Sequence, residues 1–63
     1  MVTITAAQVV PGMQILVTTG PGSEFWPMVR EVVVNDDGTR DFDVHMMGMI
    51  VGYRDDEMVV VEV

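Results

Sequence analysis

Apolar and polar residues alternate along much of this chain with a period of two, which is typical of β-strands. Between 13 and 18 the apolar face consists of Met13, Ile15 and Val17. A shorter alternation at 2–5 predicts a short strand or an extended lead-in. The last alternating stretch is 58–63, and its apolar face is formed by Val59, Val61 and Val63. Valine is the commonest residue, and its branched side chain favours strands.

A β-hairpin is predicted with strands at 28–34 and 39–47. The turn between them, 35–38, has the sequence Asn-Asp-Asp-Gly, and these residue types tolerate turn conformations. The positions expected to face inward are Met28, Arg30, Val32 and Val34 on the first strand and Phe42, Val44 and Met46 on the second. The positions expected to face water on the second strand are Asp41, Asp43 and His45.

Glycine and proline mark the other boundaries. Thr5 is a candidate N-cap for a single helical turn at 5–8, which Pro11-Gly12 prevents from continuing. Pro-Gly also suits the two central positions of a type II turn. The segment 19–24 is rich in breakers and is predicted to be an exposed loop. Pro27 delays the next strand, because it cannot donate a ladder hydrogen bond.

Two glycines, Gly48 and Gly52, lie in a strand-like segment, where glycine indicates a bulge, a bend or a close backbone approach. A charged turn follows at 54–57. The pattern therefore predicts an all-β fold of five or six short antiparallel strands, with at most one helical turn near residues 5–10. Strands spaced at roughly 8–12 residues favour a small barrel, which removes sheet edges by closing on itself. The whole chain, 1–63, is expected to form one domain.

Three segments carry a resemblance to a known group of folds. They are VVPGMQI at 9–15, WPMVREV at 26–32 and YRDDEMVVV at 53–61. A glycine-containing turn before the first long strand, a W-x-x-V-x-x-V second strand and a following hairpin make the chain similar to SH3-like small β-barrels. The resemblance implies a binding or structural module and no particular activity. The short, valine-rich, lysine-free style also resembles small proteins of actinobacteria and their phages.

The charge of the chain narrows the classes of partner. Ten acidic residues against three arginines give a formal net charge of −7, and there is no lysine. Binding to nucleic-acid phosphates or to anionic membranes is therefore not expected, because both need clustered cations. There is no cysteine, no apolar run long enough to span a bilayer and no signal-peptide pattern. The expected location is cytoplasmic.

No motif for catalysis or for a metal stands out. The acidic segment 36–43 lacks the spacing of a calcium-binding EF-hand, so a solvated turn is expected there. His45 is the only histidine, and Asp43 on the same face is its nearest candidate partner. Ser23, the only serine, lies in the predicted loop, and the chain has no phosphate-binding glycine motif. Neither a cofactor nor a metal is therefore expected.

The best candidate for a contact site is the segment around Trp26. A tryptophan beside a proline after a loop is either an anchor for a partner or a cap on the barrel core. At 32–34, 46–47 and 59–61 successive residues are apolar, so both faces of these strands are apolar. A lone barrel has a polar outer face, so this pattern predicts self-association or a constitutive partner. The residues expected to bind a partner are Phe25, Trp26, Arg30, Met47, Tyr53 and Arg54.

The sequence thus predicts a non-enzymatic small β-barrel that acts through protein–protein contacts, as a self-associating structural or accessory module of cellular or phage origin. The alternative is an acidic mimic of nucleic acid that inhibits a DNA- or RNA-binding protein of a host. A third hypothesis is an enzyme or metal protein that uses His45 with Asp41 and Asp43. No direct nucleic-acid binding and no membrane contact are expected.

Overall fold

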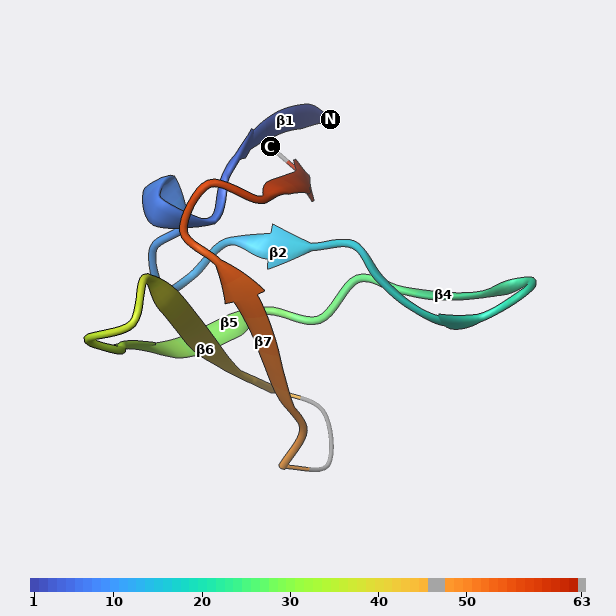
Figure 1. Cartoon of the computed structure of the whole chain (residues 1–63). Coiled ribbons are helices and arrows are strands. Elements are labelled where there is room, and N and C mark those ends of the chain that lie inside the picture. Colours follow the sequence, from blue (N-terminus) through green and yellow to red (C-terminus); the bar gives the residue numbers. More distant parts are fainter. Residues whose placement is uncertain (46–47, 63) are drawn as a thin grey trace.

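The computed structural model describes residues 1–45 and 48–62, and within them the fold is all-β (Figure 1). Its elements are β1 (Val2–Thr5), the 3₁₀ turn η1 (Ala6–Gln8), β2 (Gln14–Ile15), β3 (Val17–Gly20), β4 (Ser23–Phe25), β5 (Val29–Val34), β6 (Thr39–Val44), β7 (Ile50–Arg54) and β8 (Met58–Glu62). In this described part, no helix has the length and apolar character needed to cross a membrane.

The strands form three antiparallel sheets, in the orders β1-β8-β2, β3-β4 and β5-β6-β7. An isolated bridge between Gln14 and Met28 links the first sheet to the third. The Val29 N–H reinforces this link by donating to the Met13 carbonyl at 2.8 Å. Among the described residues no ladder joins β7 to β1, so the strands do not close into a complete ring.

Eight strands exceed the five or six that the sequence predicts. The main difference lies at 19–24, where the predicted loop is wrong. Gly20 pairs with Ser23, and only Pro21 and Gly22 form the turn between β3 and β4. Gly22 allows this tight turn because it adopts a φ of 76°, which glycine tolerates. The number of glycines and prolines in the segment predicts a break in the strand, but not how short the turn is.

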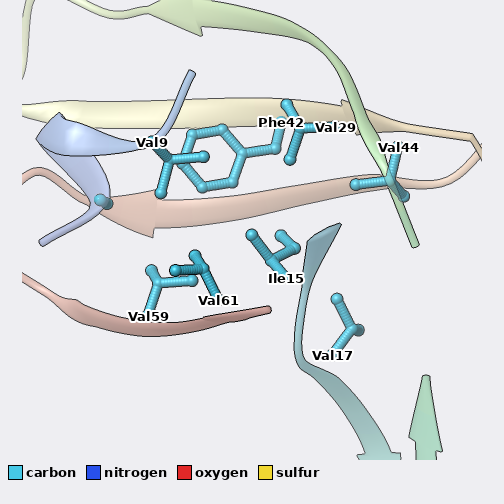
Figure 2. Close-up of a cluster of buried hydrophobic side chains, with 9 residues drawn as sticks. Val9, Ile15, Val17, Val29, Phe42, Val44, Val59 and Val61 are labelled. Carbon is cyan, nitrogen blue, oxygen red and sulfur yellow. The ribbon is translucent and has the colours of Figure 1, made fainter. Parts of the chain in front are cut away.

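The hydrophobic core lies between the β5-β6-β7 sheet on one side and β2 and β8 on the other (Figure 2). Its buried members are Ala6, Val9, Ile15, Val17, Val29, Phe42, Val44, Val59 and Val61. The apolar faces predicted at 13–18 and 58–63 supply Ile15, Val17, Val59 and Val61 to this core. The inward face predicted for the second hairpin strand is confirmed at Phe42 and Val44. The predictions for Met46, Met47 and Val63 concern residues outside the described part of the chain.

The inward face of β5 differs from the prediction. The pairing with β6 shifts between Val29 and Glu31, which is the mark of a β-bulge. Val29 therefore faces Val44 and is buried, and Val32 faces Phe42 and is half-buried. The bulge places an extra residue in the strand, so the simple alternation is wrong before it. Met28 and Arg30, which the alternation predicts inside, are exposed because they lie before or within this shift. Val34 is also predicted inside, but it is exposed because it stands opposite Arg40 at the end of the hairpin.

The turns follow the sequence closely. Thr5 precedes η1, as its predicted N-cap role requires, and Gln8 Oε1 accepts the Thr5 N–H at 3.0 Å. Gly12 has a φ of 98°, and the Met13 N–H donates to the Val10 carbonyl at 3.3 Å, which confirms the type II turn.

The β7–β8 turn joins the first sheet to the third. The Asp55 N–H donates to the Gly38 carbonyl at 2.9 Å, in the β5–β6 turn. On the other side the Ala6 N–H donates to the Glu57 carbonyl at 2.8 Å. Arg40 Nε on β6 lies 2.9 Å from Asp55 Oδ1, which adds an ion pair to the same turn. The charged segment predicted as a turn therefore also fixes the relative position of the two sheets.

Candidate interaction surface

Large hydrophobic side chains remain exposed on several elements. They are Met1, Val2, Val10, Phe25, Met28, Val33, Val34, Ile50 and Met58. On β5, Val33 is 44% exposed while its neighbour Val32 packs against the core. This strand therefore has apolar side chains on both faces, as the run of valines predicts.

The β3–β4 hairpin projects from the rest of the molecule (Figure 1). Phe25, the last residue of β4, is 36% exposed, and the next residue, Trp26, is half-buried. The half-buried hydrophobic residues that pack on the described core are Ile4, Met13, Val32, Met49, Val51 and Tyr53. Trp26 is not one of them, which favours the anchor over the core cap. A two-stranded ribbon is marginally stable alone, so this hairpin is suited to packing on another chain.

Tyr53 combines a packed ring with an accessible edge. Its ring lies on that of Phe42, with centroids 5.3 Å apart and planes inclined by 36°. Burial raises the pKa of the Tyr53 phenol above its usual value of 10.0, and the negative charge of Glu57 raises it further. Both effects penalise the phenolate, so Tyr53 is held as a neutral hydrogen-bond donor.

A shallow hollow lies on β6 and β7 beside Tyr53. Gly52 stands directly opposite Asp41, and a Cβ at this position would lie 3.2 Å from Asp41 Oδ1. Of the three alternatives predicted for this glycine, the structure shows neither a bulge nor a close backbone approach in the pairing of β6 with β7; the close neighbour is the Asp41 side chain. The hollow measures about 320 Å³ and is lined by Thr39, Asp41, Gly52, Tyr53, Arg54 and Glu57. The sequence analysis did not assign Asp41 and Glu57 to this hollow, because the pattern along one strand does not show which residue stands opposite Gly52.

Each of the three arginines has a carboxylate partner. The pairs are Arg30–Asp43 at 3.3 Å, Arg40–Asp55 at 2.9 Å and Arg54–Asp56 at 3.4 Å. Arg54 and Asp56 are each 75% exposed, so this pair contributes little to stability. Arg40 is the most shielded of the three, at 20% exposed, and its pair holds the β7–β8 turn. Arg30 and Arg54 are therefore exposed cations that are each partly neutralised by a neighbouring carboxylate.

The structure does not gather the predicted contact residues into one patch. Phe25 ends β4 at the base of the projecting hairpin, where it pairs with Val17, and Trp26 follows it. Tyr53 and Arg54 line the hollow. Figure 1 places the hairpin and the Arg54 end of β7 on different sides of the molecule. Arg30 lies on β5, and Met47 lies outside the described residues.

One further feature was not anticipated from the pattern of strands. Residues 1–23 contain no Asp, Glu, Lys, Arg or His, so every charged side chain follows from position 24 onwards. The elements β1, η1, β2 and β3 therefore have no ionisable side chain.

Nothing in residues 1–45 and 48–62 brings three His, Asp or Glu side chains together as a possible metal site. His45 is exposed, and the described partner of Asp43 is Arg30. Comparison of the chain with protein-family models, with curated proteins and with solved structures found no match.

Proposed function

We propose that this protein is a non-enzymatic small β-barrel of the SH3-like type that acts through protein–protein contacts and associates with itself as a structural or accessory module. The observation that carries the proposal is the amount of apolar surface left outside so small a core. Among residues 1–45 and 48–62, nine large hydrophobic side chains are exposed, the same number as the buried hydrophobic residues.

The barrel part of the proposal is supported by the links between sheets. The Gln14–Met28 bridge continues the order β1-β8-β2 into β5-β6-β7, which gives one curved series of strands. All the sheets enclose a shared core, to which β3 contributes Val17. The β7–β8 turn, bonded to Gly38 and to Ala6, closes one end of this series. Such an arrangement matches an open barrel better than separate layers.

Self-association is supported by the size of the core. A domain of about 60 residues buries only roughly 60% of the surface of its unfolded chain. This chain has neither a disulfide nor a cysteine to make one. Oligomerisation is then a common source of additional stability, because it covers apolar side chains that one copy leaves exposed.

Sedimentation equilibrium at micromolar concentrations tests this proposal. We expect the mass to rise above the 7.0 kDa of one chain as concentration increases. Added salt should not weaken the association, because it screens the repulsion between two chains of net charge −7. A folded monomer at every concentration would show that the proposal is wrong.

The acidic-mimic alternative predicts the opposite dependence on salt. Its affinity for a basic partner would fall as salt increases, because opposite charges would hold the complex together. Three of the carboxylates that it would use, Asp43, Asp55 and Asp56, already contact arginines within the chain. We therefore favour self-association.

A further inference from the structure

The open edge of β1 is the part of the molecule best suited to pair with another strand. β1 is the outer strand of the sheet β1-β8-β2, and it pairs with β8 without a register shift. Its sequence, Val-Thr-Ile-Thr, contains no charge and no proline. Proteins usually protect an exposed edge with charged residues, proline or a bulge, and β1 has none of these.

The other outer strands are better protected: β3 has a register shift between Thr18 and Gly20, β4 contains Glu24, and β2 is bridged to Met28. β5 contains a bulge between Val29 and Glu31, and Arg30 and Glu31 add charges beside it. β7 is interrupted by Gly52 and ends in Arg54, whose N–H donates to Glu57 Oε1 at 3.2 Å. The Arg54 N–H is therefore already bonded within the chain and is not available to a partner strand.

The hydrogen bonds of β8 establish which groups of β1 face the open edge. The Leu16 N–H donates to the Val60 carbonyl at 2.9 Å, so the polar groups of Val60 point away from β1. Since bonded and non-bonded pairs alternate in an antiparallel ladder, Thr3, which stands opposite Val60, is not bonded to β8. The bond from the Ala6 N–H to Glu57 fits the same alternation. The N–H and carbonyl of Thr3 therefore point outward from the sheet.

Thr5 also directs its backbone toward the open edge, but its N–H is not free. Gln8 Oε1 accepts it at 3.0 Å and also accepts the Thr5 hydroxyl at 3.2 Å. The edge thus offers a complete donor and acceptor pair at Thr3, and only an acceptor at Thr5. A partner strand centred on Thr3 uses all of these groups without breaking the Gln8 contact.

We propose that a second copy of this chain pairs with β1 in an antiparallel arrangement about a two-fold axis at Thr3. The inference rests on the proposed self-association and names its interface. The Thr3 N–H donates to the carbonyl of Thr3 in the second copy, and the reverse bond is its symmetry mate. The two β1-β8-β2 sheets then form one continuous sheet of six strands.

The side chains of β1 fit this register. Val2 stands opposite Val61 and Ile4 opposite Val59, so both lie on the face that turns toward the core. Val2 is nevertheless 46% exposed. Pairing at Thr3 sets Val2 of each copy opposite Ile4 of the other, so that each covers the apolar surface that the other leaves open.

Charge supports a second copy as the occupant of this edge. Two chains of net charge −7 repel each other, and the repulsion is least where the contact contains no charge. β1 and the next elements up to residue 23 form the uncharged part of the sequence. Other registers of this pairing are less suitable. A shift of two residues in one direction would place Thr3 opposite Thr5, whose N–H already donates to Gln8. A shift in the other direction would shorten the ladder.

A single cysteine tests the register. In a hydrogen-bonded antiparallel pair the Cα atoms are about 5.5 Å apart, which lies within the range of about 4.4–6.8 Å that disulfides span. The native chain has no cysteine, so Thr3→Cys introduces a unique thiol. With diamide as the oxidant, we expect Thr3→Cys to form a disulfide-linked dimer roughly tenfold faster than the control Ile50→Cys, because pairing raises the effective thiol concentration. Ile50 is 67% exposed and lies on β7.

Proline substitutions provide the second measurement. Thr3→Pro removes the donor at the edge and should halve the sedimentation mass while circular dichroism and Trp26 fluorescence stay native. Ile50→Pro, on an edge not used in this pairing, should keep the native mass. A native dimer in which Thr3→Cys crosslinks no faster than Ile50→Cys would overturn this interface and leave self-association standing. A native chain that is monomeric would overturn both.

Discussion

At the scale of single residues, Tyr53 shows how one side chain serves the core and the surface together. Its ring contacts Phe42, which is fully buried, and its edge lines the hollow beside Gly52. Burial and the neighbouring Glu57 both raise the pKa of its phenol. The sequence analysis selected Tyr53 for its residue type alone, and neither the ring contact nor the hollow was part of that prediction.

The pKa shift of Tyr53 makes stability depend on alkaline pH. Because the folded state raises the pKa above 10.0, its contribution to stability is complete below pH 10.0 and is lost as pH rises through the folded-state pKa. Tyr53 is the only tyrosine, so ultraviolet absorbance follows its titration directly. We expect a midpoint above 10.0 in the native protein and a partial decrease in Glu57→Gln. A native midpoint at or below that of the urea-unfolded chain would refute this assignment.

At the scale of elements, the hairpins differ in how they are held. The β5–β6 hairpin supplies Phe42 and Val44 to the core, whereas β4 is exposed along its whole length. Each hairpin turns on a glycine with positive φ, Gly38 at 84° and Gly22 at 76°. A Cβ at either glycine would meet no atom within 4 Å, so a substitution acts through the backbone conformation alone.

Alanine substitutions at these two glycines distinguish how much each hairpin contributes to the stability of the whole fold. We expect Gly38→Ala to lower the free energy of unfolding by about 1 kcal/mol in urea denaturation, because its turn fixes a core strand. Gly22→Ala carries the same local strain, but should mainly speed amide hydrogen exchange within β3 and β4. Equal losses of global stability in the two variants would mean that the β3–β4 hairpin unfolds only together with the core.

Alternation predicted the core face wherever one strand face was clearly more apolar. Phe42 and Val44 on β6, and Val59 and Val61 on β8, are examples. The alternation failed on β5. A bulge there changes which positions face the core, and the three successive valines at 32–34 give no alternation from which the change could be recognised. The hollow at Gly52 and the free backbone of Thr3 depend on which residues stand opposite each other. Pairing of distant strands determines this, and a single-strand pattern does not contain it.

At the scale of the whole molecule, charged side chains are confined to one part of the chain, from residue 24 onwards. The Cα radius of gyration is 10.8 Å, and within this volume the core contains one large aromatic side chain, Phe42. The uncharged first 23 residues include the open edge at β1, and the acidic residues follow in the remaining sequence. This separation lets one part of a chain of charge −7 approach another copy while the rest remains in water.

Small-angle X-ray scattering of the native protein tests self-association most directly, because it gives mass and shape together. We expect a forward intensity equal to twice the 7.0 kDa mass of the chain, with a radius of gyration well above the 10.8 Å of one copy, because edge pairing gives an elongated particle. A forward intensity of one chain mass, with a radius close to that of a single hydrated copy, would contradict the account.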